Sequence, residues 1–251
     1  MTALRLGAIR WFASSGTMLA PMQRVVSMCL ATAIVVGAVT PTASQTNGAA
    51  TPIDVGSYRA PSEGGVRRWQ VTPVDGTELL RSASQSAIAV SKLSTGDVLS
   101  NMGCAQVSGR IWCDVRPFRG GARGVVPFEH LRPAIGPDGV VPIGIDHSKK
   151  RARKRDFDAT GTIRCAQEAG QSLGGCKAGV ARGSGGDATI AVTFPNGFVR
   201  QLYFEHGEFI SASATMSGVG RDTDWELREE THLIRVDDQR FELPDVLVFG
   251  E

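Results

Sequence analysis

Apolar and polar residues alternate in short runs along most of this chain, and glycines and other turn residues separate the runs. Ile111, Cys113 and Val115 occupy every second position of one run, and the run 198–204 alternates in the same way. A period of two is typical of strands that bury one face. We find no long segment with helical periodicity, and thirty glycines favour many turns. The pattern predicts an all-β protein.

The predicted strands fall into two groups. Residues 66–134 contain five or six short runs, which we expect to close into a small barrel. Residues 161–251 contain six or so further runs joined by turn signals such as Asn196-Gly197, and predict an antiparallel meander or sandwich. Thr, Ala, Ser, Gly and Pro dominate residues 45–65, and prolines, glycines and basic residues mark 135–160. We interpret both segments as linkers.

The N-terminus is typical of an export signal. Residues 1–44 contain no acidic residue, and Arg24 precedes fifteen mostly apolar residues, 25–39. The small residues 42–44 follow as a plausible cleavage site. We therefore expect a signal peptide over 1–44, with Met22 as an alternative start, and a periplasmic or secreted mature protein. The alternative is an inner-membrane protein anchored by residues 25–39.

The cysteine count agrees with export. Cys29 lies in the signal and leaves with it, so that Cys104, Cys113, Cys165 and Cys176 remain. Four cysteines allow three pairings, and an oxidising compartment favours disulfides. The local pairing, Cys104 with Cys113 and Cys165 with Cys176, places one bridge in each group of strands, and we expect this one. The spacings do not match a zinc site, and we expect no metal and no cofactor.

Residues 66–134 resemble the bacterial SH3-like (SH3b) domain in its exported form. The resemblance is carried by Trp69, Gly96, Gly103-Cys104, Trp112-Cys113 and Leu131. It implies a small barrel that binds a ligand in a groove between its loops, outside the cytoplasm. The residues that we expect to contribute to this groove are Arg81, Trp112, Phe118 and Phe128, with Arg81 as a bidentate partner for a carboxylate.

Residues 161–251 resemble a module that accompanies SH3-like domains in exported alphaproteobacterial proteins. The resemblance is carried by five short motifs, which are Cys165-Ala-Gln, Gly174-Gly-Cys176, Val180-Ala-Arg182, Phe194-Pro-Asn-Gly and Phe241-Glu-Leu-Pro-Asp245. This module has no assigned activity, so the resemblance implies no site.

A basic run interrupts the second linker. It contains Lys149, Lys150, Arg151, Arg153, Lys154 and Arg155. The simplest interpretation is a solvated, self-repelling spacer. The alternative is an anchor for anionic envelope material, such as phospholipid head groups or lipopolysaccharide. Without residues 1–44 the chain has 24 basic and 25 acidic residues, so its overall charge does not favour a nucleic-acid partner.

We expect a non-catalytic binding module of the cell envelope that recognises peptidoglycan or a periplasmic peptide or protein through its SH3-like domain. One alternative is a glycosidase-like cell-wall hydrolase, because carboxylates surround Trp225; these belong to Asp222, Asp224, Glu226, Glu229 and Glu230. A second alternative is a structural or assembly component of an envelope complex. Every mature cysteine is assigned to a bridge, which leaves no thiol nucleophile.

Overall fold

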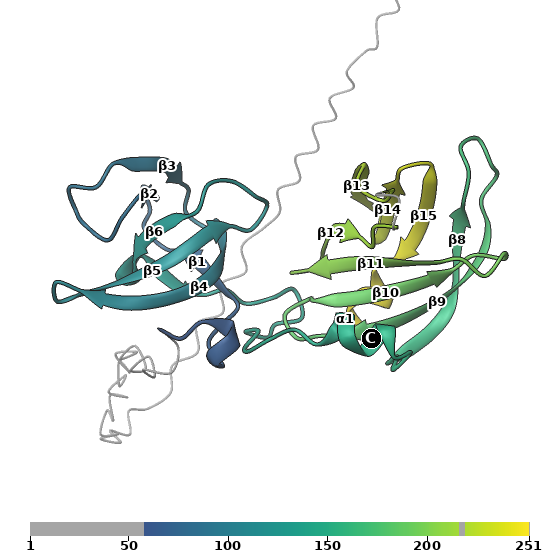
Figure 1. The fold of residues 1–251 in the computed structure, drawn as a ribbon, viewed down its shortest axis with the longest axis horizontal. Coiled ribbons are helices and arrows are strands. Elements are labelled where there is room, and N and C mark those ends of the chain that lie inside the picture. Colours follow the sequence, from purple (N-terminus) through teal and green to yellow (C-terminus); the bar gives the residue numbers. More distant parts are fainter. Residues whose placement is uncertain (1–57, 216–218, 251) are drawn as a thin grey trace, which may run out of the picture. The chain divides into compact units, whose positions relative to one another are not determined.

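The computed structural model describes residues 58–215 and 219–250. Within these ranges the chain is nearly all β and forms two antiparallel sheets, one of them nearly closed into a barrel (Figure 1). This confirms the all-β fold expected from the alternating pattern. The predicted signal peptide, the alternative start at Met22 and the alternative anchor over 25–39 lie outside the described residues.

The first sheet has seven strands in the order β3-β2-β6-β5-β4-β1-β7. Its elements, with the short 3-10 helices η2 and η3, are η2 (Pro61–Glu63), β1 (Arg68–Val71), β2 (Thr77–Leu80), β3 (Ala89–Leu93), β4 (Val98–Val107), β5 (Arg110–Pro117), β6 (Gly124–Pro127), η3 (Phe128–His130) and β7 (Leu131–Pro133).

The core of the first sheet is formed by the inward residues of its alternating strands. Trp69, Leu79, Leu99 and Val115 are fully buried there. Cys104 lies directly opposite Cys113 in the β4–β5 pair, and their sulfurs are at disulfide distance, with the Cα atoms 4.0 Å apart.

The second sheet has eight strands in the order β12-β11-β10-β9-β8-β15-β14-β13. Its elements, with the helices α1 and α2, are α1 (Ser148–Arg153), β8 (Ala159–Ala166), β9 (Gly174–Arg182), β10 (Ala188–Thr193), β11 (Val199–Glu205), β12 (Glu208–Ala212), β13 (Thr223–Arg228), β14 (Thr231–Val236), β15 (Gln239–Pro244) and α2 (Asp245–Phe249).

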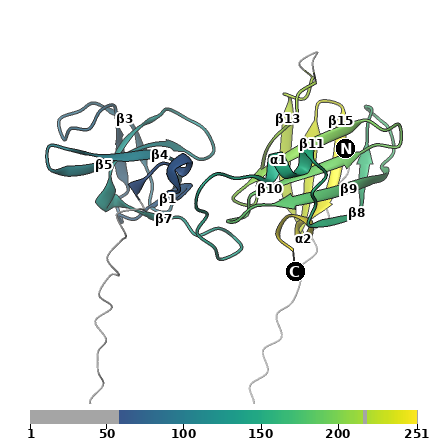
Figure 2. The same cartoon turned by 60° about the horizontal axis from the view of Figure 1, so that its bottom comes forward.

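The second sheet curls around its own core. Strand β12, at one edge, contacts β13 and β14 near the other edge, so that Ile190, Leu202, Phe204 and Phe241 pack on one inner face. Figure 2 shows β9, β10 and β11 side by side, with α1 against their outer face. The sulfurs of Cys165 and Cys176 are also at disulfide distance, as expected from the local pairing.

Most of the basic run, which we interpreted as a solvated spacer, is helical and packs on the second sheet. Residues 148–153 form α1, and Ser148 and Ala152 are buried against the second sheet. The Ser148 hydroxyl lies 2.9 Å from that of Thr189 on β10. Burial of this small, uncharged side of the helix lets it form despite the repulsion between its cations, because packing stabilises short helices more than propensity does. Among the described residues, no helix is long and apolar enough to span a membrane.

Candidate ligand-binding grooves

The four groove residues expected from the SH3-like resemblance lie in different environments. Trp112 is 5% exposed on β5, and Arg81 is exposed after the end of β2. Phe128, on η3, has its ring 5.5 Å from that of the core residue Trp69, so it packs on the core. Phe118 follows β5, and the guanidinium of Arg68 lies 5.2 Å from its ring centre.

One groove of the first sheet includes Trp112. It has a volume of about 550 Å³ and lies between the β2–β3 loop and the β4–β5 hairpin. The loop contributes a small polar surface, the hairpin contributes Val107 and Ser108, and β5 contributes Arg110 and Trp112; the loop residues are Ala83, Ser84, Gln85 and Ser86. Of the four expected residues, Trp112 alone is among those that line this groove.

The charge of this groove is largely balanced. The Arg110 guanidinium lies 5.0 Å from the Trp112 ring centre and forms an ion pair with Glu129. This arginine lowers the pKa of the Glu129 carboxyl through a hydrogen bond. A paired arginine over an aromatic ring, next to serine hydroxyls, suits a ligand that offers amide and hydroxyl groups.

A larger groove, of about 860 Å³, lies on the outer face of the second sheet. On β10 the core residues Ile190 and Val192 alternate with Thr189, Ala191 and Thr193, whose side chains therefore point to the outer face. Helix α1 covers this face at Thr189, and the groove begins beyond the helix, over Ala191 and Thr193.

The strand register orders the floor of this sheet groove into two rows. Each row crosses β8, β9, β10 and β11, a span of three strand spacings or roughly 14 Å. The first row is Thr160, Gly179, Ala191 and Gln201, and the second row is Thr162, Lys177, Thr193 and Val199. Small side chains and a glycine in the first row keep the floor open, and hydroxyl groups line it.

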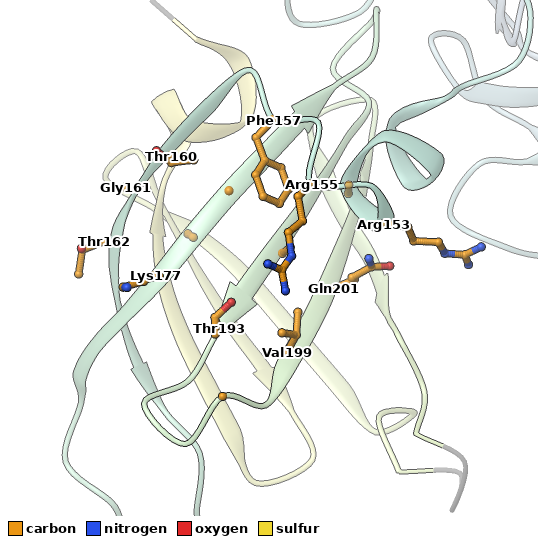
Figure 3. A pocket seen from close by; sticks show the side chains of 15 residues that line it. Arg153, Arg155, Phe157, Thr160, Gly161, Thr162, Lys177, Thr193, Val199 and Gln201 are labelled. Carbon is orange, nitrogen blue, oxygen red and sulfur yellow. The ribbon is translucent and has the colours of Figure 1, made fainter.

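Phe157 lies over the floor because position 179 is a glycine. The Asp158 amide donates to the Val180 carbonyl at 2.8 Å and holds the preceding residue against β9. A Cβ atom at Gly179 would be only 2.5 Å from the Phe157 ring. Figure 3 shows the Phe157 ring above the strands, next to the extended side chain of Arg155.

The turn after α1 positions the cations. Arg155 has a left-handed backbone (φ 59°), and its amide donates to the Ala152 carbonyl at 3.0 Å. Figure 3 shows the Arg155 side chain extending over the sheet, whereas Arg153 points away from it. Lys177, from β9, also lines the groove.

Arg151 holds this turn in place. Its guanidinium forms ion pairs with Asp158 at 2.7 Å and Asp156 at 2.9 Å, and it donates to the Arg182 carbonyl. These hydrogen bonds lower the pKa of both carboxyls and raise that of Arg151. Both carboxylates near the groove are therefore hydrogen-bonded to an arginine that does not line it.

The sequence patterns did not predict this groove, although the basic run beside it was evident. The signal was the order of residues: a basic run, then Phe157, then a strand with threonines at alternate positions. This order predicts a groove only when the pairing of Thr160 with Gly179 is known. The two residues belong to separate strands, so the local sequence does not show that they are neighbours.

The carboxylates around Trp225 lie on or next to β13. Asp222 forms an ion pair with Arg235 at 2.8 Å, and Glu226 forms one with Arg228 at 2.8 Å. Trp225 points to the opposite face of β13 from Glu226, and its Nε1–H donates to His232. Within the described residues, no group of three His, Cys, Asp or Glu side chains is arranged to hold a metal ion.

Comparisons with known proteins add no assignment. No family model matches the chain, and no curated protein matches it.

Proposed function

We propose that the protein is an exported, non-catalytic binding protein of the cell envelope. Its first sheet is an SH3-like barrel, and the groove beside Trp112 binds peptidoglycan or a periplasmic peptide. The observation that carries this proposal is the groove itself, in which a loop with three polar residues and a hairpin enclose an aromatic residue and an arginine. Grooves that combine an aromatic side chain with a few placed polar groups are typical of ligand sites.

The cysteine pairs support the exported location. Both pairs are at disulfide distance, and disulfides persist in oxidising compartments such as the periplasm. Cleavage of a signal peptide within residues 1–44 remains a prediction, which N-terminal sequencing of the periplasmic protein tests directly.

The chemistry of the groove favours a ligand with many amide and hydroxyl groups. Ser84 and Ser86 have hydroxyls 3.0 Å apart, and the exposed Gln85 lies between them. Peptidoglycan offers amides on its peptides and hydroxyls on its sugars, and both can bond to such a loop. Because Arg110 is already paired with Glu129, we expect this binding to depend only modestly on salt.

The test is retention of residues 45–251 on insoluble peptidoglycan at low and moderate salt. Retention at both supports the proposal, and it should be lost in Val107→Asp, which places a charge on the groove wall. Ile88→Asp is the matched control, because Ile88 is 70% exposed and does not line the groove. Equal retention of the two variants contradicts a site beside Trp112. If the unsubstituted protein is not retained, peptidoglycan is not the ligand, and a periplasmic peptide or protein is tested next.

A further inference from the structure

We propose that the groove on the second sheet is a separate binding site for an acidic polysaccharide, a chain of pyranose sugars that carry carboxylates. It goes beyond the binding proposed for the first sheet, since it uses different residues on a different sheet. Three features of the groove carry the inference: its unbalanced positive charge, its aromatic ring, and its long hydroxyl-lined floor.

The charge selects an anion. Among the described residues, Arg155 and Lys177 line the groove, no acidic residue does, and no ion pair involves either of these cations. The two nearby carboxylates, those of Asp156 and Asp158, are held by Arg151. A groove of one charge sign concentrates ligands of the opposite sign, and the planar guanidinium of arginine matches a carboxylate with two parallel hydrogen bonds.

The aromatic ring and the floor select a sugar chain. Phe157 offers a flat apolar surface against which the apolar face of a pyranose can pack. The hydroxyls of Thr160, Thr162 and Thr193 and the amide of Gln201 lie in two rows below it. These groups can donate to and accept from sugar hydroxyls, and a floor of roughly 14 Å extends past a single ring to its neighbours in the chain.

The lining does not suit the other anions of an envelope as well. Insertion into a lipid surface requires a broad apolar face, but among residues 58–215 and 219–250 Phe157 and Val199 are the only large apolar side chains that line the groove. A small ion such as phosphate would use the cations but would leave the threonine rows unoccupied. An acidic polysaccharide uses both.

The probe is polygalacturonate, a polymer of sugars that each carry a carboxylate, with neutral dextran and phosphatidylglycerol vesicles as comparisons. Titration of the full mature chain should show binding to polygalacturonate and none to dextran. Arg155→Asn should weaken binding about tenfold or more, the loss expected for one charge-assisted hydrogen bond. Asparagine tolerates the left-handed backbone of residue 155. Lys154→Asn is the matched control, because it removes the same charge from the same turn outside the groove.

A second pair of variants tests the aromatic ring without changing any charge. Gly179→Ala adds a methyl group that would lie 2.5 Å from the Phe157 ring and must displace it, whereas the same methyl at Gly174, on the same strand but outside the groove, meets nothing within 4 Å. We expect weaker binding only for Gly179→Ala, with circular dichroism confirming that both variants fold.

Equal effects of Arg155→Asn and Lys154→Asn would overturn the proposal in favour of a diffuse charge effect. Binding to vesicles but not to polygalacturonate would overturn it in favour of a lipid surface, and binding to neither would also overturn it. Val107→Asp separates the two proposals. It should leave polygalacturonate binding unchanged, so failure at one groove does not imply failure at the other.

Discussion

A buried histidine of the second sheet predicts how stability responds to acid. His232, on β14, is fully buried, and both of its ring nitrogens have partners. Nδ1 accepts from the Trp225 Nε1–H at 3.0 Å, and Nε2 lies 2.8 Å from an Asp245 carboxylate oxygen. Because Nδ1 accepts a hydrogen bond, the ring is neutral with its proton on Nε2, which donates to Asp245.

The direction of the pKa shift follows from this geometry. Burial lowers the pKa of His232, and the Asp245 carboxylate opposes this shift without reversing it. Protonation would place a second N–H against that of Trp225. The pKa of His232 in the folded protein therefore lies below the ordinary value of 6.5. The stability that the neutral, hydrogen-bonded His232 contributes is fully present above pH 6.5, and it is lost as the pH falls from there through the pKa of the folded protein.

The perturbation is His232→Leu, which keeps a buried side chain but removes both hydrogen bonds. A neutral bond contributes about 1 kcal/mol and a bond to a carboxylate about 1.5–3 kcal/mol, so the variant should lose about 2–4 kcal/mol at pH 7.5. At pH 5 the difference from the unsubstituted protein should be smaller, because that protein then carries the cost of a buried proton.

The assay is urea denaturation of both proteins between pH 7.5 and pH 5, with disulfides intact. Comparing the two proteins removes the contribution of other groups, such as His206, whose pKa burial also lowers. A difference that grows towards pH 5 would refute the reasoning, since it would mean that His232 is charged and stabilised by Asp245.

Further substitutions in the second sheet test its other contacts by denaturation. Replacing Cys165 and Cys176 together with serine should cost about 2–4 kcal/mol under oxidising conditions, the usual contribution of a bridge. Gln239→Leu should cost about 1–3 kcal/mol, because the Gln239 side-chain oxygen accepts from the buried Arg200 Nε at 2.8 Å. Leu202→Ala, at a fully buried core position, should cost about 2–5 kcal/mol.

The fold could be predicted from the sequence where the signals are local. Asn196-Gly197 is a two-residue turn signal, and the structure joins β10 and β11 around it. Cys104 and Cys113 lie on either side of Ser108-Gly109, and the hairpin places them directly opposite each other. Alternation of apolar residues indicated the inward side chains, because a strand carries its two faces in its own sequence.

The groove residues could not be predicted in the same way, since their grouping depends on packing between distant segments. Phe128 and Trp112 are both aromatic residues of one short stretch, and nothing local indicates that Phe128 contacts the core residue Trp69 while Trp112 reaches a groove. Similarly, the contact of Phe157 with Gly179 exists only because β8 and β9 pair in one particular register.

The basic run shows how one sequence feature can have several roles that its composition does not separate. Arg151 is used by the fold, because it binds two carboxylates and a backbone carbonyl. Lys149 lies over the Tyr203 ring at 4.5 Å and packs the helix on the sheet. Arg155, two turn residues after the helix, is directed over the groove. A spacer interpretation treats these cations as equivalent, whereas the helix points each of them in a different direction. Burial of Ser148 and Ala152 fixes which side of the helix faces the sheet. This packing, and not the charges themselves, therefore decides which cations of the run are available to a ligand.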